Sequence, residues 1–133
     1  MPAGPNATAG APVARSAAPA ACPGTWFCYP RLGIAGPIVP YTDCSGRTDV
    51  GTQIRSFTCL SDRYLMGHAY TGFGRIAGWS AGDAVTADGF TYHVTGAFQQ
   101  AGCTQPVLPL APLTLQTSLT SSACGPVLIV QAR

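Results

Sequence analysis

The chain has 133 residues, which is enough for one domain with a sizeable core and too few for two ordinary domains. Only 9% of the residues are charged, the formal net charge is +2, and no run of arginines occurs, so the sequence lacks the basic stripe that nucleic-acid binding needs. The 47% hydrophobic content, together with 16 glycines and 12 prolines, favours a filled core with many turns and few long helices.

The first part of the chain, 1–21, is dominated by Ala, Pro and Gly, and Arg15 is its only charged residue. Such a segment cannot bury a core, so we expect an extended arm ahead of one domain over 22–133. An arm of this kind is expected to engage a protein partner or to mediate self-assembly. The sequence contains no run of 18 apolar residues, and we expect no membrane span in this chain.

Short apolar runs and alternations predict strands along the rest of the chain, and no segment carries a sustained helical stripe. Asp88-Gly89 predicts the tight turn of a hairpin, and Gly72–Trp79 predicts one short helical turn. The fold class predicted is all-β, with the sheet closed into a barrel that leaves no exposed edge. The predicted strands lie near 26–39, 54–59, 63–69, 84–86, 90–98, 107–117 and 127–132.

The six cysteines show no CxxC pair and no zinc-ligand spacing, so we expect neither a metal nor another cofactor. An even count in a short, loop-rich chain favours disulfides and an oxidising, extracellular compartment, with free buried thiols as the alternative. Six cysteines allow 15 pairings. We expect the sequential one, Cys22–Cys28, Cys44–Cys59 and Cys103–Cys124.

One histidine stands out as a candidate for chemistry. His68 ends the apolar run Tyr64-Leu65-Met66-Gly67, after a glycine that would let the backbone turn tightly. A histidine in this place could serve as a general acid or base, or it could be an ordinary polar residue at a strand end. His93 alternates with Tyr92 in a predicted strand and is expected to face solvent. Eight aromatic residues could line a peptide groove or fill the core and its rim. They are Trp26, Phe27, Tyr29, Tyr41, Tyr64, Tyr70, Phe73 and Trp79.

Four blocks follow one another along the chain. They are Tyr29–Pro40; Gly67-His68 with Phe73, Ile76, Trp79 and a Gly-Asp-x-Val block at Gly82–Val85; Leu113–Ser118; and Val127–Arg133. In this order they resemble the sortase family, the cell-surface transpeptidases of Gram-positive bacteria, in its actinobacterial form. The resemblance covers about residues 29–133 and implies a barrel of about eight strands, a peptide ligand and a place at the cell surface.

The resemblance also implies a catalytic cysteine, histidine and arginine. His68 occupies the histidine position, Ser118 the cysteine position and Gly125 the arginine position. A serine needs an adjacent base to attack, and glycine cannot replace a guanidinium, so we predict a catalytically degenerate site. An engineered Cys→Ser change and a shifted alignment remain alternatives for Ser118. Cys124 is either a displaced nucleophile or the disulfide partner of Cys103.

The sequence thus favours an exported, disulfide-stabilised protein that has lost transpeptidase catalysis. It would act in a structural or binding role, for example as a subunit of a surface filament or a virion. The alternative is an active transpeptidase or hydrolase that cleaves a cell-wall sorting peptide, with Ser118 or Cys124 as the nucleophile and His68 as its partner.

Overall fold

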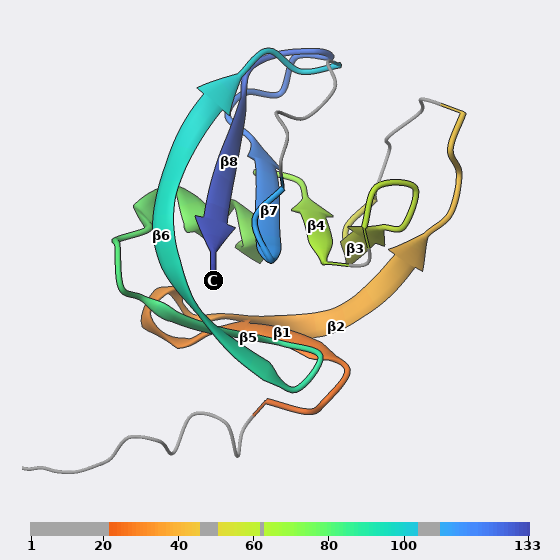
Figure 1. Ribbon diagram of the computed structural model, residues 1–133. Coiled ribbons are helices and arrows are strands. Elements are labelled where there is room, and N and C mark those ends of the chain that lie inside the picture. The colour runs from red at the N-terminus through yellow and green to blue at the C-terminus, as the bar shows by residue number, and fades with distance from the viewer. Residues whose placement is uncertain (1–21, 46–50, 62, 104–109) are drawn as a thin grey trace, which may run out of the picture.

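The computed structural model describes residues 22–45, 51–61, 63–103 and 110–133, so the predicted arm and part of the predicted strand 107–117 lie outside the described residues. Eight strands close into a barrel in the order β1-β2-β3-β4-β7-β8-β6-β5 (Figure 1), which confirms the predicted fold class. The elements are β1 (Trp26–Tyr29), η3 (Pro30–Leu32), β2 (Ile34–Tyr41), β3 (Ile54–Phe57), β4 (Tyr64–Gly67), η4 (Gly72–Gly78), β5 (Ala84–Ala87), β6 (Phe90–Gln100), β7 (Leu113–Ser118) and β8 (Val127–Ala132). Among the described residues, no helix has the length and apolar character needed to cross a membrane.

Two of the neighbouring strand pairs are parallel, namely β2 with β3 and β4 with β7. In the second pair Gly67 lies opposite Thr117, the penultimate residue of β7. Parallel strands end at the same edge of a sheet, so the residues that follow Gly67 and Thr117 lie next to each other. This register brings two distant parts of the sequence to one place.

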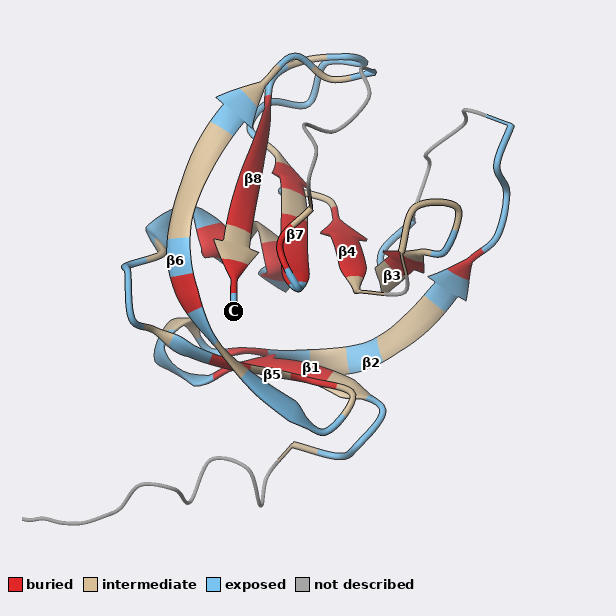
Figure 2. Cartoon of the chain, in the orientation of Figure 1, coloured by how far each residue is buried: buried red, intermediate tan, exposed pale blue. Residues whose placement is uncertain are grey.

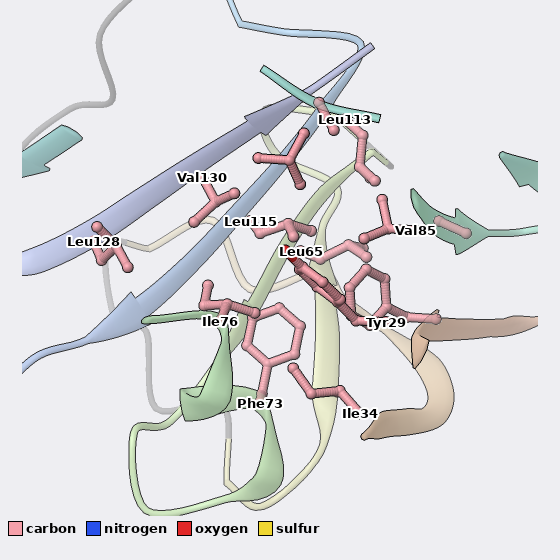
Figure 3. Close-up of a cluster of buried hydrophobic side chains, with 14 residues drawn as sticks. Tyr29, Ile34, Leu65, Phe73, Ile76, Val85, Leu113, Leu115, Leu128 and Val130 are labelled. Atoms are coloured by element: carbon pink, nitrogen blue, oxygen red, sulfur yellow. The ribbon is translucent and has the colours of Figure 1, made fainter. Parts of the chain in front are cut away.

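The hydrophobic core lies inside the barrel, against β4, β7 and β8. Figure 2 shows these three strands as buried over most of their length, whereas the longer β6 is mostly exposed or partly buried, with Val94 as its buried residue. The close-up in Figure 3 shows Phe73 and Ile76 of η4 pointing toward this core. Phe73 packs against Phe27 of β1 with ring centroids 5.4 Å apart. The short helix η4 is therefore held by its apolar side chains.

Two local predictions are confirmed. Asp88 and Gly89 both adopt positive φ angles, 49° and 82°, in the two-residue connection between β5 and β6, as a type I′ hairpin turn requires. The helical turn expected over Gly72–Trp79 is η4, and the Thr71 hydroxyl caps it by accepting a hydrogen bond from Phe73 N–H. The predicted strand 26–39 is two strands, because Pro30–Leu32 form η3 and Gly33 turns the chain with a φ of 67°.

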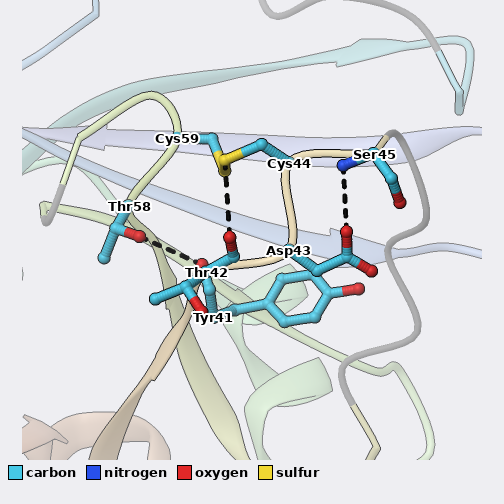
Figure 4. Close-up of a disulfide and its surroundings, with 7 residues drawn as sticks. All are labelled: Tyr41, Thr42, Asp43, Cys44, Ser45, Thr58 and Cys59. Atoms are coloured by element: carbon cyan, nitrogen blue, oxygen red, sulfur yellow. Dashed lines mark hydrogen bonds between the residues drawn. A yellow bond between two sulfur atoms is a disulfide. The ribbon is translucent and has the colours of Figure 1, made fainter.

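All six cysteines lie among the described residues, and none is a free thiol. The bonds join Cys22 to Cys28, Cys44 to Cys59, and Cys103 to Cys124, as expected from the sequence. Figure 4 shows the second bond, which ties the segment after β2 to the segment after β3, beside a hydrogen bond from the Thr58 hydroxyl to the Tyr41 carbonyl. A bond that closes a loop of this size typically stabilises a fold by about 2–4 kcal/mol.

A charged cluster fastens η3 to the start of β5. Arg31 donates to both carboxylate oxygens of Asp83, at 2.8 and 2.7 Å, and to the Gly78 carbonyl at 2.6 Å. Tyr29 OH and Ser80 N–H donate to the same carboxylate. The Arg31 guanidinium lowers the pKa of Asp83 to about 2, while burial, together with the Asp83 carboxylate, raises the pKa of Tyr29 to about 12. The Gly-Asp-x-Val block of the sequence therefore has a structural role here.

Candidate functional site

The ends of β4 and β7 bring together two of the site residues predicted from the sequence. His68 follows the last residue of β4, and Ser118 is the last residue of β7. The two segments are joined directly, because Ala69 N–H donates a hydrogen bond to Ser118 Oγ at 3.3 Å. The hydroxyl thus lies at the position that the parallel register assigns to it, beside the turn that carries His68.

The backbone of His68 is held by η4. Its carbonyl accepts hydrogen bonds from Thr71 N–H at 3.1 Å and from the Thr71 hydroxyl at 2.7 Å. A Cβ atom on Gly74 would lie 2.2 Å from the Ala69 carbonyl oxygen, and one on Gly67 would lie 2.6 Å from Phe73. The glycine before His68 therefore serves the close approach of η4, since it is the last residue of a strand and not the tight turn that the sequence indicated.

The His68 imidazole lies against an exposed aromatic ring. The ring centroids of His68 and Tyr70 are 5.0 Å apart and the planes differ by 15°, so the two rings are stacked. Tyr70 is 74% exposed. We call these two rings the aromatic platform. In the sequence Tyr70 is one of several aromatic residues, and nothing there indicates which of them would stack on the histidine.

A pocket of about 660 Å³ opens beside the aromatic platform. Gln116 and Ser118 of β7 line it, together with a wall formed by the connection from β7 to β8, which includes Thr120 and Ser122. Gly102 and the Cys103–Cys124 bond complete the wall. A Cβ on Gly102 would lie 2.3 Å from the Gly125 carbonyl oxygen, so the segment after β6 lies directly against the β7–β8 connection.

The pocket wall is almost free of charge. Among the described residues that line it, no arginine and no carboxylate is present, and His68 is the only basic side chain. Gly125, at the position implied for the catalytic arginine, belongs to the wall itself. A Cβ there would lie 2.3 Å from Thr120 Oγ1, so a longer side chain at 125 would have to displace the Thr120 side chain.

The remaining sequence candidates lie outside this arrangement. Cys124 lines the pocket but its sulfur is bonded to Cys103, so a Cys124 nucleophile would require that bond to be broken first. His93 is exposed on β6 and exchanges backbone hydrogen bonds with Arg133, which confirms the prediction of a solvent-facing strand histidine. Within the described segments, no group of three or more His, Cys, Asp or Glu side chains is placed to hold a metal ion.

No family model and no curated protein matches the chain. Solved structures do match: sortase A from Corynebacterium diphtheriae (16% identity, TM-score 0.57, covering 81% of this chain and 58% of that one), sortase A from Listeria monocytogenes (15%, 0.56, 81% and 85%), and sortase C from Clostridium perfringens with the C-terminal cell wall sorting motif (14%, 0.54, 80% and 67%). The chain thus spans well under two thirds of the Corynebacterium protein and about two thirds of the Clostridium one. These likenesses show that the chain has a sortase-like fold.

Proposed function

We propose that this chain is a sortase-fold protein that binds an extended, uncharged peptide segment and has lost cysteine transpeptidase catalysis. The observation that carries the proposal is the identity and setting of Ser118. Its hydroxyl stands at the end of β7, next to the turn that holds His68, and accepts a hydrogen bond from Ala69 N–H. Every sulfur that could replace it as a nucleophile is in a disulfide.

The pocket supports binding of a peptide. Hydroxyl groups of Ser118, Thr120 and Ser122 line it and can pair with peptide N–H and C=O groups, and the aromatic platform offers an apolar face. A charged group of the ligand would lose its hydration in the pocket and would find no opposite charge there to compensate. The peptide segment inside the pocket should therefore be neutral. The Clostridium perfringens sortase C structure, which has the same fold, contains a cell wall sorting motif, and this favours a peptide of that class.

The same residues argue against efficient cleavage. A serine attacks a carbonyl only when a base removes its proton and donors stabilise the oxyanion. The Ala69 N–H near the hydroxyl already donates to Ser118 Oγ. It therefore does not point at a place where an oxyanion could form. No guanidinium lines the described pocket, and a side chain at position 125 would first have to displace the Thr120 hydroxyl. Acylation of Ser118 by a bound peptide should therefore be slow.

Three disulfides are typical of proteins from an oxidising compartment, and we place this protein at the cell surface or outside the cell. The protein would have a binding or structural role there, for example as a subunit of a surface filament or a virion. In that role the small-residue arm 1–21 would engage the partner.

Deletion of 1–21 should abolish oligomers seen by light scattering. A full-length protein that stays monomeric at high concentration would contradict this part of the proposal.

The peptide-binding proposal is tested with a fluorescein-labelled synthetic peptide that carries a C-terminal cell wall sorting motif. Fluorescence anisotropy should show saturable binding that His68→Ala and Tyr70→Ala weaken. His93→Ala is the matched control for the first variant, because His93 is an exposed histidine on β6 that does not line the pocket. Absence of saturable binding to the unmodified protein, or equal losses in both histidine variants, would contradict the proposal.

A second function is favoured by one observation, namely that Ser118 and His68 line the same pocket. The pair could act as a serine hydrolase if the imidazole removes the hydroxyl proton. A fluorophosphonate probe distinguishes the two functions, because an activated serine forms a covalent adduct with it. Labelling that disappears in both Ser118→Ala and His68→Ala would support the hydrolase, whereas an unlabelled protein supports binding without cleavage.

A further inference from the structure

We propose that the Cys103–Cys124 bond is a thiol-exchange site, which a small thiol opens while the barrel stays folded, and that opening it removes one wall of the pocket. Neither the sortase-like fold nor the proposed peptide binding assigns this role to the bond. Only the expected effect on peptide affinity rests on the proposed function. The exchange itself is a property of the two sulfur atoms and their surroundings.

Access distinguishes this bond from the other two. Cys103 and Cys124 are both exposed, whereas each of the other two bonds has at most one exposed cysteine. Cys28 is buried with 6% of its surface accessible and Cys22 is half-buried, while Cys44 is exposed but its partner Cys59 is half-buried. Exchange begins when a thiolate reaches a sulfur along the S–S axis, so at least one sulfur must be open to solvent. Exposed disulfides are the labile ones, while buried disulfides resist reduction.

The backbone adds a second, independent distinction. Cys103 and Cys124 have φ angles of 59° and 58°, in the left-handed region that residues other than glycine rarely adopt. Such a conformation costs about 1–3 kcal/mol per residue and persists only where the surroundings enforce it. Among the described residues, Asp88 in the hairpin turn is the only other non-glycine residue with a positive φ. Breaking the bond would allow both cysteines to relax.

The bond lies outside the elements that close the barrel. The ladder between β6 and β8 ends at the pair Gln100–Val127, and the ladder between β7 and β8 ends at the pair Ser118–Val127. Cys103 and Cys124 lie beyond the ends of both ladders. Opening the bond should therefore leave the sheet intact and should free only the two segments beyond its end.

Those two segments form a wall of the pocket. Gly102, Cys103, Cys124 and Gly125 all line it, and the bond keeps Gly102 so close to Gly125 that no side chain fits between them. Once the bond is open, no covalent link holds this approach. The pocket would then lose a defined wall, and any ligand would have to order it at an entropic cost.

The exchange proceeds in two steps. The thiolate of a small thiol attacks one cysteine sulfur, the bond between the two cysteine sulfurs breaks, and a mixed disulfide forms. The other cysteine leaves as a thiolate and takes up a proton. A second thiol attacks the mixed disulfide, which yields two protein thiols and one oxidised small molecule. Reduced glutathione is a suitable probe.

The digestion pattern makes the test specific. The chain contains seven basic side chains, all of them arginine, so trypsin places Cys22 and Cys28 in 16–31, Cys44 in 32–47, Cys59 in 56–63, and Cys103 with Cys124 in 76–133. The folded, full-length protein is treated with glutathione, quenched with iodoacetamide and digested without further reduction. We expect label in 76–133 to appear at least about tenfold faster than in the other fragments, with an unchanged far-ultraviolet circular dichroism spectrum.

Label that appears first, or at an equal rate, in any other cysteine fragment would overturn the proposal, as would label that appears only with loss of the circular dichroism signal. Hydrogen exchange adds a check on the wall: amides of 121–125 should exchange faster in a Cys103→Ser/Cys124→Ser double variant but not in a Cys44→Ser/Cys59→Ser control. Unchanged exchange in the first variant would overturn the wall claim.

Peptide affinity separates this proposal from the proposed function. If the oxidised protein binds the sorting-motif peptide and the Cys103→Ser/Cys124→Ser variant binds it several-fold more weakly, both stand. If the oxidised protein does not bind the peptide, the proposed function fails while the labelling result still decides the exchange site. If both forms bind equally, the wall claim is wrong.

Discussion

The amide of Ala69 donates a hydrogen bond to the hydroxyl of Ser118, and these two residues lie 49 positions apart in the sequence. The bond is possible because β4 and β7 are parallel neighbours that end together. It fixes the hydroxyl beside the turn that carries His68. His68 and the Ser118 hydroxyl therefore line one pocket.

The close approach of η4 to β4 should make Gly67 sensitive to any side chain. Gly67→Ala places a Cβ 2.6 Å from Phe73, which is 2% exposed in the core and cannot move without disturbing Phe27. Overpacking of this kind costs about 1–3 kcal/mol, which urea unfolding would measure. Gly96→Ala is the control, since nothing lies within 4 Å of a Cβ there. Equal stability of the two variants would show that the contact is not rigid.

The Asp83 carboxylate should make stability depend on acid pH. Arg31 lowers the pKa of Asp83 to about 2, below its ordinary value, so between about pH 4 and pH 2 the unfolded chain binds more protons than the folded one. The stabilisation is fully present above about pH 4 and is lost as the pH falls through about 2.

Asp83→Asn should remove this dependence and cost about 1–2 kcal/mol at pH 7, a figure kept small because Arg31 is half exposed to solvent. Asp88→Asn is the matched control, because asparagine also tolerates the positive φ of that turn. Urea unfolding from pH 2 to pH 7 measures both. A wild-type curve that is flat below pH 4 would contradict the role of the Arg31–Asp83 pair.

The aromatic platform should contribute to peptide affinity. Tyr70→Ala removes the ring stacked on His68, and the loss of one exposed aromatic contact should weaken binding by about fivefold, or about 1 kcal/mol. Phe90→Ala provides the comparison, because Phe90 is also an exposed aromatic at 59% but does not line the pocket. Titration of the labelled peptide by anisotropy would reveal whether the two losses differ; equal losses would count against a specific role for Tyr70.

A thiol at position 118 should not by itself produce transpeptidation. Ser118→Cys supplies a nucleophile beside His68, but the described pocket still offers no guanidinium for the oxyanion. We expect the new thiol to react with iodoacetamide and yet to release no measurable product from the sorting-motif peptide, as followed by chromatography. Turnover by this variant would show that His68 and the backbone suffice for catalysis once a thiol stands at position 118.

The sequence predicts much of the fold because its local signals are strong. Asp88-Gly89 can hardly form anything but a tight turn, and the apolar run over β8 is a buried strand in the structure. The sequence predicts one strand over 26–39, because the apolar character of this run hides the break at η3 and Gly33. Local patterns depend on residues that are neighbours in the sequence. Here the residue that turns the chain, Gly33, lies within an apolar run and is not recognised as a turn.

The site is less predictable, because its contacts join residues far apart in the chain. Placing His68 and Ser118 together follows from the order of the blocks, but the hydrogen bond from Ala69 and the stacking of Tyr70 depend on register and side-chain orientation. The pairing of Arg31 with Asp83 carries no local signal at all, since 52 positions separate the two residues. These contacts become visible only when strand order and register are known.

The most direct measurement is intact-protein mass spectrometry after incubation with the sorting-motif peptide. Binding without cleavage predicts that the denatured protein keeps its unmodified mass, that the peptide is recovered whole, and that a peptide complex appears only under native conditions. A covalent acyl adduct that maps to Ser118 in the unmodified protein, together with release of the C-terminal part of the peptide, would contradict the account.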